Sequence, residues 1–381
     1  MSSSHELEEH RGYLADERKT AAYRAALAEV VGPDDVVLDL GAGSGLLGYL
    51  ACDAGASSVL AVDRGDIVDL ARQIASDNGY ADRISHIKAL STGLALDTRA
   101  TVAVCDQIGG LVHDAGILGC FADARDRLLV PDATLVPASF RIFMAPVRFD
   151  QARTAIDFWL SKPSGLDVSA AHEVAVNSEW LYRMGDNEEP SALSPGAEIA
   201  SFGADHDNPI SGSAEFQVDQ PGRFDGYLGW FEAQMSPSVT LTNDPWSPER
   251  FDRWCNFYAV DAPVELEEGD RVRLQLDIRP RLGVVTWATT CTREGERLAT
   301  SHNTTFRGSF LAPETIVGAE VDRPLAPTAR TTAIREALNL LDGCRSQSEL
   351  VTALSPMIGG IFLSRNQLMR FVRDLADLIR G

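Results

Sequence analysis

The sequence lacks several features that would assign it to other classes of protein. No segment approaches the ~18 uninterrupted apolar residues of a membrane-spanning helix. Its six cysteines are scattered, with no close Cys-x-x-Cys pair and no histidine at ligand spacing. The first residues show neither the basic nor the apolar region of a signal peptide. We therefore expect a cytoplasmic protein with reduced thiols, no metal site and no membrane contact.

Positive charge is also scarce. The 381 residues include 34 Lys and Arg against 55 Asp and Glu, which gives a formal net charge of −21. Binding along a phosphate backbone needs clustered cations, so we expect no nucleic-acid partner. An acidic protein would suit a cationic acceptor, whether small molecule, peptide or protein, although acidity also serves solubility alone. The length predicts two or three domains.

What the chain does contain is a strand, turn and helix pattern near its start. An apolar run that includes Asp39 breaks into three alternating glycines, Gly41, Gly43 and Gly45, before a helix-compatible segment. Glycines let the backbone pass close to a ligand, and the helix presents its positive end to that ligand. A dinucleotide fingerprint would require a third glycine at Leu46. The acid-led spacing therefore favours S-adenosyl-L-methionine (SAM) over NAD, and a dehydrogenase is the weaker alternative.

A second acid follows one βαβ unit after the first. Asp63 comes directly after the apolar strand at 59–62, where a carboxylate can accept both ribose hydroxyls of an adenosyl group; it could instead cap the next helix. Further strands at 84–87 and 102–105 alternate with helices. Because ligands bind beyond the carboxyl ends of parallel strands, we expect Gly41, Asp63, Thr92 and Asp106 on one rim.

The pattern of predicted helices and strands divides the chain into three regions. Residues 1–137 have the alternating pattern of an α/β, Rossmann-like domain. Residues 138–325 form short strands broken by Gly and Pro, typical of an antiparallel barrel or sandwich, and are interrupted by a helical arm at about 154–189 that includes a helix over 170–182. Residues 326–381 are helical. The predicted fold class is therefore α/β followed by β, with a C-terminal helical extension.

The order of these parts resembles the protein arginine methyltransferases over residues 5 to about 310. The first match is His10-x-x-Tyr13-Leu14-x-Asp16-x-x-Lys19-Thr20-x-x-Tyr23, against the family's H-x-x-M-L-x-D-x-x-R-T-x-x-Y. The second is the acid-led glycine loop with Asp63. The third is the stretch 251–256, where the family carries T-H-W-x-Q. The resemblance implies a class I methyltransferase domain, a β-barrel, SAM as cofactor and a homodimer formed through the arm.

The sequence departs from the family at the acceptor side. The family clamps a guanidinium between two glutamates nine residues apart, and the aligned positions here are Asp106 and Ala115, with Asp114 one place early. Arg253 stands for the family histidine, and Asp252 for its threonine. Each lost charge-assisted hydrogen bond would cost about 1.5–3 kcal/mol. The missing second carboxylate therefore argues against a conventional protein arginine methyltransferase.

The candidate site residues fall into three groups. Lys19 replaces an arginine that holds the cofactor carboxylate, and Thr92 an acid near the adenine amine. Cofactor contacts are expected from Lys19, Asp39, Gly41, Gly43, Gly45, Asp63 and Thr92. Acceptor contacts are expected from Tyr13, Asp106, Asp252 and Trp254. Catalytic roles are expected for Asp106, Asp114, His113 and Arg253.

Three interpretations of the acceptor site stay open. In the first, Asp106 with Asp114 or His113 orients a different nitrogen or oxygen nucleophile, on a free amino acid, a peptide or a natural-product precursor. His113 is then the candidate general base, unless it is simply a loop histidine. In the second, the protein is an arginine methyltransferase with a remodelled clamp. In the third, it binds SAM without catalysis, as a regulatory or scaffold protein.

Overall fold

The computed structural model describes residues 3–185, 189–308, 329–340 and 345–358, together with residues 365, 368, 369 and 371–373. It divides into two compact units, Met1–Phe310 and Leu311–Gly381. In the second unit the described helices are α9 (Ala329–Leu340) and α10 (Gln347–Ile358). None of the helices among the described residues is long and apolar enough to cross a membrane.

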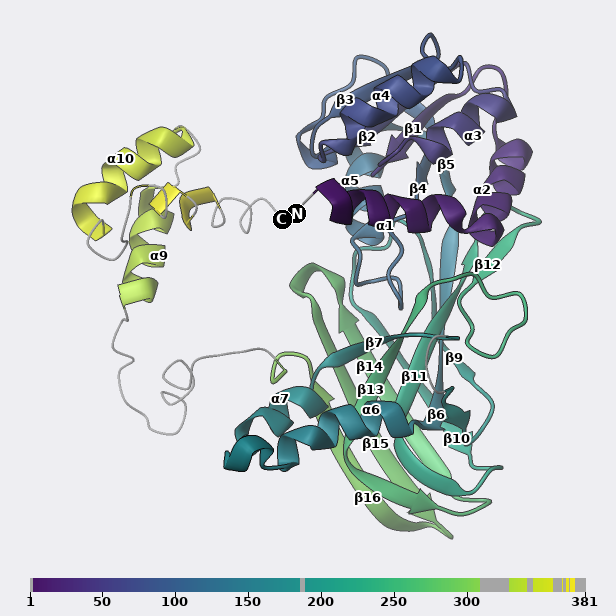
Figure 1. Cartoon of the computed structure of the whole chain (residues 1–381), viewed down its shortest axis with the longest axis vertical. Helices are drawn as coiled ribbons and strands as arrows, with labels where there is room; N and C mark the ends of the chain where they lie inside the picture. The colour runs from purple at the N-terminus through teal and green to yellow at the C-terminus, as the bar shows by residue number, and fades with distance from the viewer. Residues whose placement is uncertain are drawn as a thin grey trace. The chain divides into compact units, whose positions relative to one another are not determined.

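A five-stranded parallel sheet forms the N-terminal half of the first unit (Figure 1). The strand order is β3-β2-β1-β4-β5, so the chain adds β2 and β3 on one side of β1 and β4 and β5 on the other. The switch point, where ligands bind in such sheets, therefore lies between β1 and β4. The strands are β1 (Val36–Leu40), β2 (Ser58–Asp63), β3 (Ile84–Lys88), β4 (Ala100–Cys105) and β5 (Leu129–Val136). This sheet confirms the predicted Rossmann-like core.

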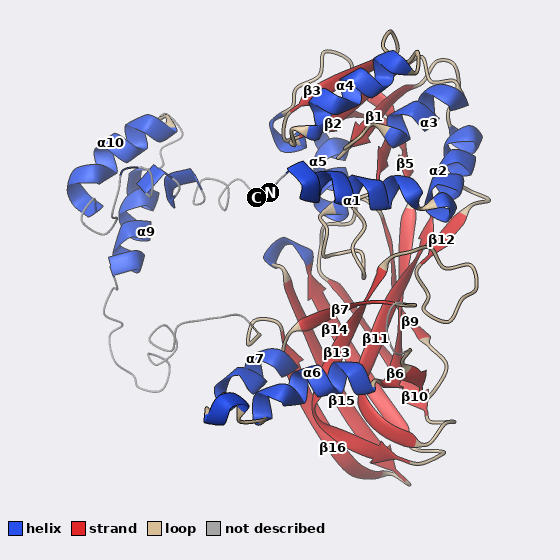
Figure 2. Cartoon of the chain, in the orientation of Figure 1, coloured by secondary structure: helices blue, strands red, loops and turns tan. Residues whose placement is uncertain are grey.

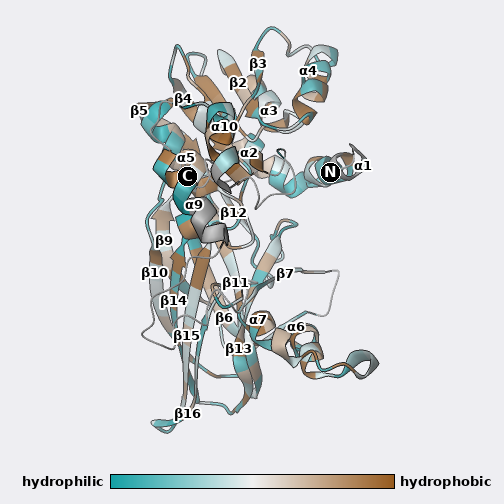
Figure 3. Cartoon of the chain, turned by 90° about the vertical axis from the view of Figure 1, so that its left-hand side faces the viewer, coloured by the Kyte–Doolittle hydropathy of each residue, from teal (hydrophilic) through white to brown (hydrophobic). Residues whose placement is uncertain are grey.

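Helices with buried apolar side chains cover the sheet. Helix α4 (Ile67–Asp77) buries Val68, Ala71 and Ala75, and in Figure 3 it carries hydrophobic and hydrophilic residues on different sides. The other helices of this half are α1 (Ser3–Ala15), α2 (Glu17–Val30), α3 (Leu46–Ala54) and α5 (Ile117–Arg127), with the short 3-10 turn η1 (Ser91–Gly93) before β4.

Helix α2 is positioned by its cap and by one buried tyrosine. Asp16 accepts a hydrogen bond from the backbone N–H of Lys19, which satisfies an otherwise free donor at the helix start. Tyr23, fully buried, donates its hydroxyl to the carbonyl oxygen of Cys105 at the end of β4. These two contacts place Lys19 beside the carboxyl end of β4.

The rest of the first unit consists of two antiparallel sheets (Figure 2). One has the order β7-β13-β11-β6-β8, with β9 and β12 on its flanks, and the other the order β10-β14-β15-β16. The bounds are β6 (Ser139–Arg148), β7 (Glu179–Arg183), β8 (Ser191–Ala192), β9 (Ala197–Gly203), β10 (Ile210–Gln217), β11 (Gly222–Gln234), β12 (Thr240–Thr242), β13 (Trp254–Leu266), β14 (Arg271–Arg279), β15 (Val284–Arg293) and β16 (Glu296–Thr304). The antiparallel β domain is thus confirmed, and its closure as a barrel stays a prediction.

The arm between β6 and β7 contains α6 (Asp150–Asp157) and α7 (His172–Val176), joined by short 3-10 turns. Arg153, almost fully buried, ties α6 to the sheet by donating to the carbonyl oxygen of Val260 at 3.2 Å. The helix predicted over 170–182 ends at Val176, because residues 179–183 instead pair with β13. The role of this arm in a dimer stays a prediction.

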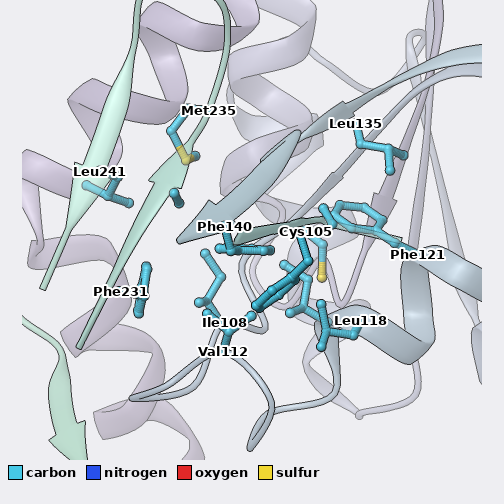
Figure 4. Close-up of a cluster of buried hydrophobic side chains, with 14 of the residues drawn as sticks. Cys105, Ile108, Val112, Leu118, Phe121, Leu135, Phe140, Phe231, Met235 and Leu241 are labelled. Atoms are coloured by element: carbon cyan, nitrogen blue, oxygen red, sulfur yellow. The ribbon is translucent and has the colours of Figure 1, made fainter. Parts of the chain in front are cut away.

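An apolar core joins the parallel and antiparallel sheets directly beneath the segment 106–116. Figure 4 shows Ile108 and Val112 from this segment among Phe140 of β6 and Phe231 of β11, all at most 1% exposed. Val112 has φ of 71°, a left-handed conformation that a β-branched residue rarely adopts. Packing therefore holds this segment in a strained conformation.

Candidate functional site

The glycine turn after β1 forms one wall of a cavity of about 600 Å³. Gly41 and Gly43 both have positive φ, 74° and 52°. A Cβ on Gly43 would lie 2.6 Å from the His10 ring, and one on Gly41 would lie 2.5 Å from Gln107 Nε2. The backbone here therefore requires glycine and lies open to the cavity. The volume is in the range of small-molecule and cofactor sites.

Two acids hold the turn in place. Asp39 is fully buried, its Oδ2 accepts from the Gly48 N–H at 2.9 Å, and burial raises its pKa to about 7. Asp63 accepts from the backbone N–H of Gly43 at 2.9 Å and from that of Gly65 at 2.7 Å. Asp63 lines the cavity, whereas Asp39 supports the start of α3 from behind it.

At the other end of this cavity, one carboxylate is shared by two cations. Asp106 follows β4, its Oδ2 pairs with Lys19 Nζ, and its Oδ1 accepts from Arg253 Nη2 at 2.8 Å. The side chains of Lys19 and Arg253 are only 3% and 13% exposed. Lys19 also lies over the Tyr13 ring and Arg253 over the Phe251 ring, at 4.8 and 5.3 Å from the ring centroids. The cluster has a net charge of +1.

The second carboxylate of a guanidinium clamp has no equivalent at the aligned position. Ala115 lines the cavity there. Asp114 turns back onto its own loop, where Oδ2 accepts from the Gly110 N–H at 3.0 Å and Oδ1 from the Leu111 N–H at 3.3 Å. Gly109 permits this fold, since a Cβ there would lie 1.7 Å from Asp114 Oδ1. Asp114 thus stabilises the loop rather than extending alongside Asp106.

His113 points away from the cavities into a buried polar cluster. Its Nε2 lies 3.1 Å from Glu179 Oε1, and its Nδ1 lies 3.1 Å from the Leu111 carbonyl oxygen. Burial opposes a charge on the ring, but Glu179 outweighs burial and raises the pKa of His113. Burial likewise opposes the Glu179 charge, and His113 with Tyr258 and Asn256 lowers the pKa of Glu179 overall. Both shifts favour a charged pair, which leaves the general-base role of His113 a prediction.

Glu179 also connects the loop to the antiparallel domain. It accepts from the Tyr258 hydroxyl and from Asn256 Nδ2, both on β13. Nearby, Asn243 Nδ2 donates to the carbonyl oxygen of Gly110 at 2.9 Å and to that of Trp254 at 2.7 Å. The sequence pattern does not single out Glu179, because only the fold brings β7 against this loop.

A second cavity, of about 1100 Å³, adjoins the first and is lined by α1, α2, the loop 109–115, β7 and β13. Its wall includes two apolar side chains that are about half exposed, Leu181 and Trp254. Asp252 lies at its rim in an ion pair with Arg183. The two cavities share the lining residues Glu9, Tyr13, Lys19, Ile108, Ala115 and Arg253.

The structure thus brings most of the candidate residues together around the two cavities. The first cavity is lined by Tyr13, Lys19, Gly41, Gly43, Asp63, Asp106 and Arg253. The second is lined by Tyr13, Lys19, Asp114, Asp252, Arg253 and Trp254. Four predicted residues line neither: Asp39, Gly45, Thr92 and His113. Thr92 lies exposed on η1, and Gly45 caps the N-terminus of α3.

Comparison with known proteins identifies the kind of enzyme to which this site belongs. A family model described as ribosomal protein L11 methyltransferase (PrmA) matches residues 19–134. Two solved structures share the fold over most of the chain. The Trypanosoma brucei PRMT1 enzyme-prozyme heterotetrameric complex with AdoHcy has a TM-score of 0.65 at 20% identity, covering 77% of this chain and 97% of that one. Arabidopsis thaliana protein arginine methyltransferase 10 has a TM-score of 0.64 at 18% identity, covering 78% and 98%.

Curated relatives agree with the structures. The "Probable protein arginine N-methyltransferase 6" of Arabidopsis thaliana is 30% identical over 192 residues, which are 50% of this chain and 42% of that protein. The chain therefore spans less than half the length of this relative. The "Arginine N(omega)-methyltransferase" of Streptomyces achromogenes subsp. streptozoticus is 28% identical over 277 residues, 70% of this chain and 75% of that protein.

The fold and these matches support a class I methyltransferase that depends on S-adenosyl-L-methionine. More particularly, the chain is related to the arginine methyltransferases. The cavity fits this cofactor, because positive-φ glycines leave backbone without side chains along one wall and Asp63 supplies a carboxylate there. Because these matches are to methyltransferases, they favour the two enzymatic interpretations over the non-catalytic one.

Proposed function

We propose that this enzyme transfers a methyl group to a nitrogen or oxygen nucleophile on an acceptor other than protein arginine. Free amino acids, peptides and natural-product precursors are the acceptor classes that we favour. The single observation that carries the proposal is the state of Asp106, which is shared by Lys19 and Arg253 while Ala115 stands at the position of a second carboxylate.

We assign the cofactor to the first cavity. The glycine turn would lie against it, Asp63 would accept the ribose hydroxyls, and Lys19 would hold its carboxylate. When bound, SAM supplies an electrophilic methyl group on a sulfonium. The residues of this chain contribute orientation and exclusion of water, because the acceptor lone pair must be held ~3 Å from the carbon it attacks.

The acceptor side favours a nucleophile that needs one carboxylate only. A guanidinium is delocalised, and two carboxylates are needed to concentrate its charge on the nitrogens that do not attack. Here, a guanidinium beside Asp106 would also approach Arg253, and two like charges ~4 Å apart repel by about 1–4 kcal/mol. A neutral amine or a hydroxyl avoids this repulsion and can donate its proton to Asp106.

An arginine acceptor in a remodelled clamp is the second candidate. The Streptomyces relative, which aligns with 70% of this chain, is named an arginine N(omega)-methyltransferase and not a protein arginine methyltransferase. In this alternative the guanidinium would take the place of Arg253 at Asp106, and Arg253 would turn into the second cavity.

We extend the proposal to the organisation of the protein. The proposed functional domains are 1–137, 138–325 with an arm at 154–189, and 326–381. Exposed Phe158, Leu160 and Leu166 in the arm support a homodimer, since clustered exposed apolar side chains favour association. A cytoplasmic location completes the proposal.

A labelled methyl-transfer assay tests the proposed function. The full-length protein is incubated with radiolabelled SAM and host lysate, which is then separated into protein and metabolite fractions. We expect label in the metabolite fraction, and none when Asp106→Asn replaces the wild type. Label confined to the protein fraction would contradict the proposal and return the enzyme to the conventional class.

A further inference from the structure

Two cations and one carboxylate are buried together where the two cavities meet. Lys19 and Arg253 are both largely buried and have a single carboxylate, Asp106, between them. Glu9, which lines both cavities, is exposed and accepts a hydrogen bond from the Tyr13 hydroxyl. Burying a cation without a full counter-charge costs free energy, so binding of an anion beside Lys19 and Arg253 would be favourable.

Bound SAM does not supply this anion in net charge, although Lys19 would hold its carboxylate. It carries one carboxylate, but also an ammonium and a sulfonium, and so adds a further positive charge to the assembled site. A cationic acceptor would place a further cation beside Lys19 and Arg253, whose shared ion-pair partner among the described residues is Asp106. An acceptor with a carboxylate would reduce the excess.

Arg253 has the geometry to bind such a carboxylate. Only Nη2 donates to Asp106, and Nε is buried with no hydrogen-bond partner among the described residues. The guanidinium is held in place by Asp106 and by the Phe251 ring beneath it, so little freedom is lost when it binds a ligand. Its planar set of N–H donors matches the two oxygens of a carboxylate.

We infer that the acceptor carries a carboxylate close to the atom that is methylated, and that Arg253 binds it. This inference rests on the proposed transfer to a small acceptor and specifies its class as amino acids and related acids. Arg253 lines both cavities, and the second, with about 1100 Å³ and the side chains of Leu181 and Trp254, accommodates the remainder of such a molecule.

A purely structural role is the competing explanation, in which Arg253 does no more than hold Asp106. The two explanations differ in what they predict for pairs of compounds that differ only in the carboxylate. Suitable pairs are an amino acid and its decarboxylated amine: arginine with agmatine, histidine with histamine, and tyrosine with tyramine.

The test uses the full-length protein and labelled SAM with each compound as acceptor. Each compound is also tested as an inhibitor of labelling of the lysate metabolite fraction, so that binding without methylation is still detected. For wild type we expect the acid of at least one pair to exceed its amine by about 10- to 100-fold in kcat/KM or in inhibition. Arg253→Gln should bring this ratio close to one, and Arg253→Lys should retain part of it.

Arg72→Gln is the matched control. Arg72 lines neither cavity and lies exposed on α4, paired with Asp69, so its loss should leave the ratio unchanged. A purely structural Arg253 would lower activity with acid and amine alike, which would overturn the inference. Equal binding of acid and amine by wild type would overturn it too. The absence of label from the metabolite fraction would instead contradict the proposed function itself.

Discussion

The two adjoining cavities of this methyltransferase differ in how their chemistry is built. The cofactor cavity depends mostly on backbone: a glycine turn with positive φ angles, held by Asp63 through two N–H groups. The acceptor side depends on side chains: Ala115 and Arg253 line it, and Asp114 accepts from N–H groups of its own loop instead of forming the family's two-carboxylate clamp. A glycine turn with positive φ angles tolerates few substitutions, whereas individual side chains around the acceptor can be replaced one at a time. The donor can therefore stay the same while the acceptor changes.

The largest effect is expected from Asp106→Asn, which acts at the boundary between the two cavities. It removes the carboxylate that we propose orients the acceptor, and it leaves Lys19 and Arg253 without their shared partner. We expect methyl transfer to fall by roughly 100-fold or more, as for a misplaced reacting group. Single-turnover assays would measure this fall, with Asp114→Asn as the control for loop integrity. Undiminished transfer would place the chemistry elsewhere.

Asp63→Ala tests the cofactor cavity alone. It removes a carboxylate that would accept ribose hydroxyls and that also braces Gly43 and Gly65. At about 1.5–3 kcal/mol for a charge-assisted hydrogen bond, affinity should fall by roughly 10- to 100-fold. Calorimetry with S-adenosylhomocysteine measures this, with the exposed Asp69→Ala as control. Unchanged affinity would rule out the ribose assignment and remove the contrast between the cavities.

Glu179→Gln tests the support of the acceptor loop. It keeps the size of the side chain but removes the charge that pairs with His113, and we expect the free energy of unfolding to fall by about 1–3 kcal/mol. Because the pKa of His113 is raised, its contribution is present below 6.5 and is lost as pH rises through the raised value. The lowered pKa of Glu179 makes its contribution present above 4.5 and lost as pH falls through the lowered value.

The difference in stability between wild type and Glu179→Gln should therefore be greatest between pH 4.5 and 6.5 and shrink on either side. Urea unfolding at several pH values measures it. We expect this variant to lower kcat more than it changes KM, since the loop is displaced rather than removed. A pH-independent difference would mean that His113 and Glu179 are not a charged pair, and Glu173→Gln, at an exposed position, serves as control.

The smallest effect is expected from Lys19→Arg, which restores the cation that the family motif has at this position. Both residues are positive, so cofactor affinity should change by only a few-fold, about 1 kcal/mol. Arginine is larger, and Lys19 is buried beside Tyr13 and Asp106. Calorimetry measures the cofactor affinity of both proteins. A large loss of affinity in Lys19→Arg would contradict the expectation and show that this site requires lysine.

The contrast between the cavities also explains what the sequence could reveal. The glycine turn, Asp63 and the alternating strands are encoded within short stretches, so the parallel sheet and the cofactor could be predicted. The contact between His113 and Glu179 could not, since it joins a loop and β7 through the antiparallel sheet. Similarly, the sequence places Asp114 in the loop but does not show that its carboxylate accepts from the N–H groups of Gly110 and Leu111. Local sequence also favours a helix up to residue 182, and pairing with β13 makes a strand there instead.

A direct competition between acceptors tests the central claim, that the acceptor site no longer serves protein arginine. Purified full-length enzyme receives labelled SAM with equal concentrations of an arginine-rich peptide, blocked at both ends, and a mixture of free amino acids. The account predicts that label enters the free amino acids and leaves the peptide unlabelled. Label that enters the peptide preferentially would contradict it.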